Sequence, residues 1–332
     1  MHYDELLEQA LEKMEASGMD ESWLNLGCET KSQNRLNREY MDRITFVTRL
    51  IEAAEADIST ELFGVQLETP IISSVWARGR VLETLKHGSV AWYKSPPYLE
   101  HIASALGSVG SMMGVGAVEL HELAGFVNHG CPMYHVVKPK PDEDLIFEHL
   151  KAAEKAGYVA VGMDITPSFG HKALNEDPSI DVNQRPKTKK QLASYVEATS
   201  LPFIVKGVLS VEDAVASKDV GASAIVVSNH GGECIDYSAP ILKMLPEIRE
   251  AVPDLKIIVD SGFRRGTDAL KALCLGADAV AIVTPQVIGY AANGRHGVQA
   301  MMESLSAELQ RTMSAVGIKD IASANADVLR ML

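Results

Sequence analysis

The sequence predicts a TIM (β/α)8 barrel, an α/β fold, preceded by an N-terminal helical cap. The length of 332 residues suits either two ordinary domains or one such barrel. Short apolar runs alternate with helical patterns, and these units repeat eight times over about 260 residues, the usual length of a TIM barrel. The runs are continuously apolar, as is typical of strands that helices cover on both faces. Together these observations favour the barrel over a doubly wound sheet.

The first four predicted strand–helix units lie between residues 69 and about 200. TPIISS (69–74) precedes the helical YLEHIASALGSVG, and SMMGVG (111–116) precedes ELHELAGFVNHG. PMYHVVK (132–138) is followed by DEDLIFEHLKAAEKAG, whose amphipathic period indicates a helix that ends at a glycine. YVAVGMDI (158–165) leads through a polar loop to TKKQLASYVEAT.

The last four units repeat the alternation. The strand runs are PFIVKGV (202–208), SAIVVSNHG (223–231), KIIVDSGF (256–263) and AVAIVT (279–284). Their helices begin at SVEDAVASKDVG, APILKMLPEIREAV, RGTDALKALCLG and a long final helical region. We therefore expect a cap over residues 1–68, the barrel over 69–317 and a C-terminal tail over 318–332.

Composition excludes several classes of protein. Apolar residues make up 46% and charged residues 23%, which is ordinary for a globular protein. The net charge of -13 argues against a nucleic-acid binder, because such proteins neutralise phosphates. The four cysteines contain no CxxC pair, so neither a metal site nor a disulfide framework is expected. The N-terminus is charged and amphipathic, and no run approaches the roughly 18 apolar residues of a membrane span. We expect a cytoplasmic protein that does not bind membranes.

Polar residues stand at the C-terminal ends of the predicted strands. In a TIM barrel these ends converge on one mouth, where the active site lies. Several titratable residues on one rim therefore predict a catalytic site. They are Lys138, Asp164, Lys206, Ser228, Asn229, His230 and Asp260.

Three motifs on successive strands carry a specific resemblance. IVKGV, VVSNHGG and VDSGFRRGTDALKALCLGADAV occur in this order, and the chain resembles the FMN-dependent α-hydroxy acid oxidase and dehydrogenase family. The resemblance is strong over about residues 200–317 and weaker over 26–75 and 110–170. It implies FMN as cofactor, a small-molecule substrate, and a homotetramer or octamer.

The resemblance assigns residues to the flavin. Lys206 would lie beside the N1–C2=O edge, where a cation stabilises the charge of the reduced ring. Arg264 would bind the phosphate together with amides at a helix N-terminus, and Asp260 the ribityl chain. Further flavin contacts are expected from Ser228, Gly262, Ala77 and His135, of which His135 replaces a third-strand glutamine.

His230 matches the family's catalytic base. An imidazole suits this role because its pKa lies near working pH, and Gly231 lets the backbone turn close to a planar ring. In the family an aspartate on the fourth strand orients the histidine. Asp164 is the candidate, but aligning the Thr-Pro pairs places Ile165 there, and a one-residue slip reverses the strand face. Both alignments remain open.

The substrate-binding positions depart from the family. Glu233 stands where an arginine is expected and would repel a carboxylate. Lys172 replaces a second arginine and lacks its planar fork. Val137 aligns with a carboxylate-binding tyrosine, and Trp23 with another tyrosine. A neutral or cationic head group would suit Glu233, whereas Lys172 or Arg185 would receive an anionic one.

The phosphate end departs as well, since the family's Gly-Arg after the eighth strand is Val283-Thr284. Three functions remain open. The first is an FMN-dependent oxidoreductase that removes a hydride from a hydroxyl-bearing carbon, with altered substrate recognition. The second is an FMN-dependent reductase or a flavin isomerase of the isopentenyl-diphosphate type. The third is a non-catalytic flavin-binding protein, against which the presence of both Lys206 and His230 counts.

Overall fold

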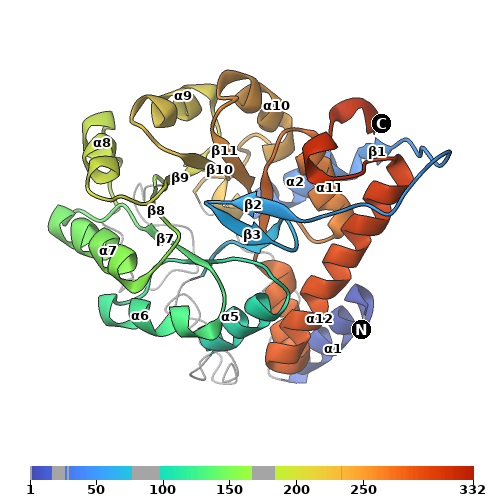
Figure 1. Cartoon of the computed structure of the whole chain (residues 1–332), viewed down its shortest axis with the longest axis horizontal. Coiled ribbons are helices and arrows are strands. Elements are labelled where there is room, and N and C mark those ends of the chain that lie inside the picture. The colour runs from blue at the N-terminus through green and yellow to red at the C-terminus, as the bar shows by residue number, and fades with distance from the viewer. Residues whose placement is uncertain (1, 17–26, 28–29, 77–97, 167–183, 233) are drawn as a thin grey trace.

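A computed structural model describes the chain except for residues 1, 17–26, 28–29, 77–97, 167–183 and 233. It contains the predicted parallel barrel, with helices in a ring around the strands (Figure 1). The sheet runs in the order β4-β12-β11-β10-β9-β8-β7-β6-β5. Its two end strands, β4 (Ile71–Ser73) and β5 (Val75–Trp76), are separated by one residue, so the first barrel strand joins both edges. β4 pairs with β12 and β5 with β6, which closes the barrel.

The remaining barrel strands coincide with the apolar runs. They are β6 (Met113–Val115), β7 (Met133–Val137), β8 (Ala160–Asp164), β9 (Phe203–Val208), β10 (Ala224–Val227), β11 (Lys256–Val259) and β12 (Ala279–Ile282). The barrel helices are α5 (Tyr98–Ser108), α6 (Leu123–Phe126), α7 (Glu143–Ala156), α8 (Lys189–Glu197), α9 (Val211–Asp219), α10 (Ile241–Ala251), α11 (Gly266–Cys274) and α12 (Thr284–Val316). Local caps define their starts: Asp142 accepts from the Leu145 amide at α7, and Ser210 from the Asp213 amide at α9.

Alternate residues of each strand face opposite sides of the sheet. One buried cluster fills the barrel interior and includes Tyr134, Val136, Ile204 and Val226. A second cluster lies between the strands and the helices and includes Val137. This alternation decides which strand-end residues enter the mouth.

The expected N-terminal helical cap contains β-strands as well as helices. It contains α1 (Tyr3–Ala16), α2 (Ser32–Asp42), β1 (Ile44–Phe46) and the hairpin of β2 (Thr60–Leu62) and β3 (Val65–Leu67). Leu62 and Leu67 belong to the interior cluster, so the hairpin packs against the barrel core (Figure 1). The expected tail also forms structure, because β13 (Leu329–Met331) pairs antiparallel with β1.

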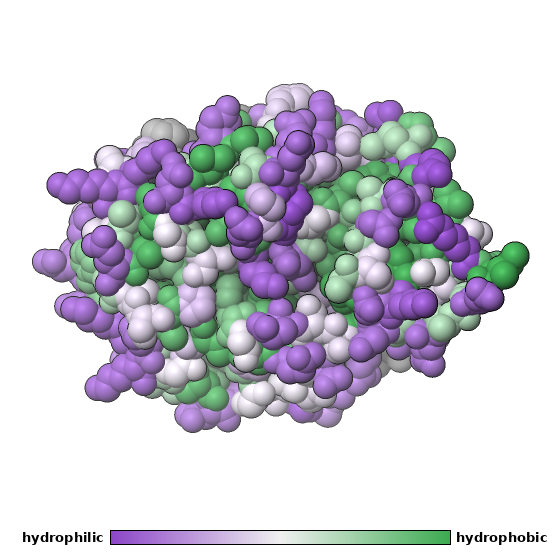
Figure 2. Space-filling view, turned by 45° about the horizontal axis from the view of Figure 1, so that its top comes forward, coloured by the Kyte–Doolittle hydropathy of each residue, from purple (hydrophilic) through white to green (hydrophobic). Residues whose placement is uncertain are grey.

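Hydrophilic and hydrophobic residues are interspersed over the face shown in Figure 2. Large exposed apolar side chains include Leu50, Ile51 and the C-terminal Leu332. Within the described part of the chain, no helix is both long enough and apolar enough to cross a membrane.

Candidate active site

The C-terminal ends of β9, β10 and β11 bring a buried lysine, a serine and a buried aspartate together at the barrel mouth. Lys206, on β9, lies 3.2 Å from the Asp260 carboxylate and 3.3 Å from the Ser228 hydroxyl. Asp260 also accepts a hydrogen bond from the Ser74 hydroxyl at 2.9 Å. Lys206 is only 4% exposed and Asp260 6%, so each charge depends on the other for compensation. The structure thus brings together three of the residues assigned to the flavin: Lys206, Ser228 and Asp260.

The strand alternation also resolves the fourth-strand alignment. Asp164 Oδ2 lies 3.4 Å from His230 Nδ1, an ion-pair contact that is longer than an ordinary N–H···O hydrogen bond. The Ile165 side chain instead packs against the cluster between the strands and the helices. The other Asp164 oxygen, Oδ1, accepts from the Thr166 amide at 3.0 Å, which helps to hold the carboxylate in place. The fourth-strand residue that faces His230 is therefore Asp164, and Ile165 points away from the mouth.

A lysine completes this cluster. Lys138 Nζ donates to Asp164 Oδ2 at 2.8 Å and lies 3.4 Å from His230 Nε2. Burial alone would raise the pKa of Asp164, but the charges of Lys138, His230 and Lys206 outweigh it and hold that pKa well below its usual range. Asp164 is consequently ionised at any working pH.

The loop that carries His230 has an unusual backbone. His230 adopts a positive φ of 55°, which is uncommon for a residue other than glycine, and Gly231 follows at 64°. The His230 amide donates to the Ser228 hydroxyl, and the Gly231 amide to the Ser261 hydroxyl, both at 3.1 Å. A side chain at Gly231 would meet no atom within 4 Å. The loop is thus held both from within, through Ser228, and from the loop after β11, through Ser261.

Helix α2 supports the same loop from outside the barrel. Asn37 and Asn229 exchange two amide hydrogen bonds, at 3.2 and 3.0 Å. Gly232 packs so closely on Gln33 that an added Cβ would lie 2.5 Å from the Gln33 Cβ. These contacts join residues about 200 positions apart in sequence and position the loop before any substrate arrives.

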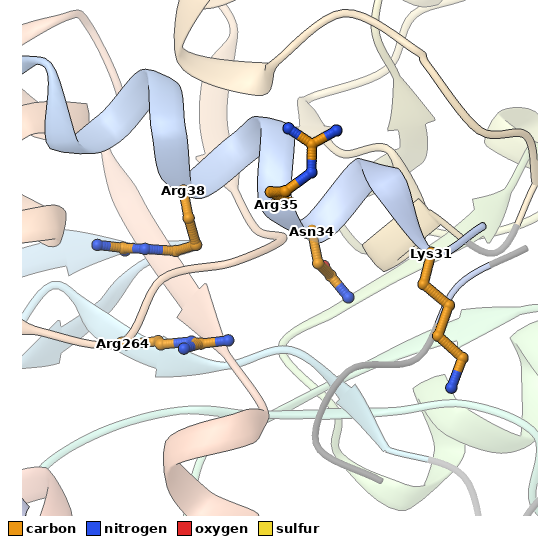
Figure 3. A pocket seen from close by; sticks show the side chains of 5 residues that line it. All are labelled: Lys31, Asn34, Arg35, Arg38 and Arg264. Carbon is orange, nitrogen blue, oxygen red and sulfur yellow. The ribbon is translucent and has the colours of Figure 1, made fainter. Parts of the chain in front are cut away.

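Arg264 lines a cationic cavity of about 340 Å³ between α2 and the loop that precedes α11. The other lining residues are Lys31, Asn34, Arg35 and Arg38. In Figure 3, Lys31 and Asn34 extend from α2 toward the side on which Arg264 lies, whereas Arg35 extends to the opposite side. Arg35 pairs with Glu39 at 2.7 Å, and Arg38 with Asp42 and Asp268 at 2.7 and 2.6 Å. The attraction for a phosphate dianion therefore rests chiefly on Lys31 and Arg264.

The amides at this helix start are engaged, contrary to one expectation. Asp268 accepts from the Arg264 and Arg265 amides at 3.0 and 3.1 Å and from the Arg38 guanidinium at 2.6 Å. A phosphate near Arg264 would therefore rely on side-chain cations rather than on these two amides. Gly262, at φ 91°, supplies its carbonyl to Arg38 at 3.2 Å.

These features fit FMN. The buried Lys206 would lie at the flavin ring, and the cavity at Arg264 would receive the phosphate. The two ends of such a ligand are thus represented by separate groups of cations at one barrel mouth.

His135 requires a correction. It does not face the mouth: its Nδ1 bonds the Val115 carbonyl at 2.9 Å, and its Nε2 lies 3.2 Å from His149 of α7. The predicted flavin contact is therefore wrong, because odd-numbered residues of β7 point toward the helices. Val137, aligned with the substrate-binding tyrosine, also faces outward, and its neighbour Lys138 occupies the mouth.

The remaining predicted residues are placed only in part. Arg185 is exposed, and its amide bonds the Pro139 carbonyl at 3.0 Å. The other four predicted positions lie outside the described residues, so their assignments stay predictions. They are Trp23, Ala77, Lys172 and Glu233.

Sequence reasoning missed four contributors to the site. Lys138 is a strand-end residue to which the sequence assigned no role, because a strand buried on both faces gives no alternation of polarity that would place this side chain in the mouth. Nothing in the local sequence singles out the other contributors. They are Ser74, Asn37 and Arg38.

Comparisons with known proteins agree with this geometry. A family model described as FMN-dependent dehydrogenase matches residues 13–189 and 171–331. Glycolate oxidase 3 of Arabidopsis thaliana is 29% identical over 362 residues, covering 97% of this chain and 92% of that protein. Glycolate oxidase of Spinacia oleracea is 28% identical over 358 residues, covering 96% and 92%.

Solved structures give the same result. A mandelate oxidase variant crystallised with 2-hydroxy-phenylacetamide has a TM-score of 0.87 at 25% identity, covering 99% of this chain and 98% of that one. Mandelate oxidase with 3,3-difluoro-2-hydroxy-3-phenylpropionic acid has a TM-score of 0.86 at 26% identity, covering 99% of both chains. Another mandelate oxidase structure holds an FMN adduct.

The fold and the site define a flavin-dependent oxidoreductase built on a TIM barrel. The chain belongs to the FMN-dependent dehydrogenase family, and FMN is its cofactor. The predicted family, barrel fold and enzyme class, an oxidoreductase that acts on CH–OH donors, are confirmed.

Proposed function

We propose that the enzyme oxidises a small molecule at a hydroxyl-bearing carbon, with His230 as the base and Asp164 as the group that orients it. The single observation that carries this proposal is the arrangement of Asp164, His230 and Lys138 at the barrel mouth. Because His230 Nδ1 faces the ionised Asp164, Nε2 is the nitrogen that can accept the hydroxyl proton. A relic histidine would not need such a partner, which counts against a non-catalytic role.

The reaction balances as follows. The O–H proton passes to His230 Nε2, the C–H bond breaks with its electron pair, and the carbon–oxygen bond becomes a carbonyl. FMN, when bound, supplies the acceptor for that hydride. Asp164 stabilises the imidazolium that forms, and Lys206 provides a buried cation where negative charge develops.

The relatives suggest which compounds to test. Two are named glycolate oxidases and others mandelate oxidases, so 2-hydroxy acids and their neutral analogues form the first panel. The repulsion predicted between Glu233 and a substrate carboxylate stays a prediction, since that residue lies outside the described part of the chain. Assembly as a homotetramer or octamer rests on the resemblance, and a cytoplasmic location on the sequence alone; both are parts of this proposal.

The test is the anaerobic reduction of the protein-bound flavin, followed by its loss of visible absorbance. The unmodified protein is expected to bleach with at least one compound of the panel. His230→Ala is expected to keep its flavin yet to bleach roughly 100-fold more slowly, the usual scale for a lost general base. Equal rates for the two proteins would remove His230 from the mechanism.

A further inference from the structure

We infer that Lys138 determines substrate specificity by binding an anionic group on the carbon that is oxidised. This inference rests on the proposed function, because it places the reacting hydroxyl at His230. Lys138 stands at the end of β7, two residues beyond Val136, which lies in the barrel interior. Its side chain continues that inward face and reaches both Asp164 and His230.

Covalent geometry brings the anion to the lysine. A hydroxyl that donates to His230 Nε2 lies about 2.8 Å from it, and Lys138 Nζ is 3.4 Å from the same nitrogen. A carboxylate on the hydroxyl-bearing carbon lies one bond from the reacting centre, so one of its oxygens can reach Nζ when the carboxylate is turned toward Lys138. An ammonium has three N–H donors, and its contacts with Asp164 and with His230 Nε2 engage at most two of them.

Exposure permits this contact. The Lys138 side chain is 23% exposed, whereas the Asp164 side chain is 3% exposed. Asp164 is therefore almost wholly covered, while part of the Lys138 side chain stays accessible from outside the cluster. Lys206, a second lysine at this mouth, is 5% exposed and paired with Asp260.

The charge balance favours an anionic substrate. With a neutral imidazole, the ammonium of Lys138 and the carboxylate of Asp164 cancel. Once His230 takes the proton, the cluster carries a net positive charge, with two cations 3.4 Å apart that repel one another. A substrate carboxylate beside Nζ restores neutrality, whereas a neutral amide leaves the repulsion in place.

An alternative role for Lys138 is purely structural, as the partner that holds Asp164 in place. The two roles predict different results with substrates that match in shape and differ in charge. Suitable pairs are mandelate and mandelamide, lactate and lactamide, and glycolate and glycolamide. If Lys138 binds the anion, its loss lowers flavin reduction by the acid alone. If Lys138 only positions Asp164, its loss lowers flavin reduction by both the acid and the amide.

The experiment measures the flavin reduction rate against substrate concentration for each pair, in the parent, Lys138→Met and Lys138→Arg. Lys140→Met is the matched control, because it removes a lysine from the same β7 loop outside the cluster. We expect Lys138→Met to lower the acid-to-amide preference by about 10- to 100-fold, the scale of a hydrogen bond to a charged group. Lys138→Arg is expected to restore part of it, and Lys140→Met to leave it unchanged.

Equal slowing of acid and amide in Lys138→Met would overturn the inference and leave the structural role. Should no compound bleach the parent, the proposed function fails, and the inference is then decided by binding. The dissociation constants of each pair are read from the shift of the flavin spectrum on titration. If the parent binds the acid more tightly than the amide and Lys138→Met loses this preference, Lys138 is the anion-binding residue even though the oxidation is not. If no pair shows such a preference, the inference is refuted.

Discussion

The replacement of Asp164 by asparagine tests how much the carboxylate contributes to the base. Asparagine is nearly isosteric, and its side-chain oxygen can still accept from the Thr166 amide, which Asp164 Oδ1 does at 3.0 Å. What is lost is the negative charge, which lies 3.4 Å from His230 Nδ1 and 2.8 Å from Lys138 Nζ. At an effective dielectric near 20, two unit charges at this separation attract by about 5 kcal/mol.

The net effect is smaller than this Coulomb energy. Asp164 is shared with Lys138, and the mouth admits solvent, so the measured loss approaches that of a hydrogen bond to a charged group, about 2–3 kcal/mol. Since 1.4 kcal/mol is a factor of ten, flavin reduction by substrate is expected to slow by about 30- to 150-fold. The carboxylate stabilises the imidazolium, so the rate constant at saturating substrate is expected to fall more than the affinity changes.

The assay is rapid anaerobic mixing of the flavin-loaded protein with substrate over a range of concentrations. Flavin content and melting temperature are measured in parallel, because a protein that had lost its cofactor or fold would also be slow. Asp164→Glu is the charge-conserving comparison. A reduction rate for Asp164→Asn within about twofold of the parent would refute the assignment of Asp164 as the partner of the base.

Two further predictions concern the cofactor and the stability of the fold. Arg264→Ala is expected to weaken FMN binding by at least about tenfold while leaving riboflavin binding unchanged, because only FMN carries the phosphate; equal losses for both flavins in fluorescence titrations would place the phosphate elsewhere. Burial, with a smaller contribution from its neighbour His149, lowers the pKa of His135 to about 3, and burial and Lys140 lower that of His149 to about 4. In the unfolded chain both histidines take up protons near pH 6.5, whereas in the folded chain they stay neutral at that pH. Their contribution to the free energy of unfolding is therefore complete above pH 6.5 and is lost as the pH drops toward 4. His149→Phe is expected to reduce the loss of melting temperature between pH 7 and 5, by an amount equivalent to about 1–2 kcal/mol, and an unchanged pH dependence would exclude the pair as its cause.

The barrel was predictable because its signal is local. Each strand is a continuous apolar run and each helix has its own period and cap, so the order of elements follows from the chain alone. The same applies to Lys206, Ser228 and Asp260, which end apolar strands and meet at the mouth as expected. The N-terminal segment was less predictable, since the short strands β1 and β13 form only by pairing with each other across the whole chain.

By itself, the sequence determined the family, the flavin and the rim on which the chemistry lies, because these depend on motifs and on strand order. Tertiary structure alone decided which side chains enter the mouth. Strands buried on both faces show no alternation of polarity, so a one-residue shift in β7 places His135 against α7 and Lys138 beside the base, with no local signal to choose between them. The pairing of Asn37 with Asn229 was equally hidden, because the contact exists only once α2 packs against a loop almost 200 residues away.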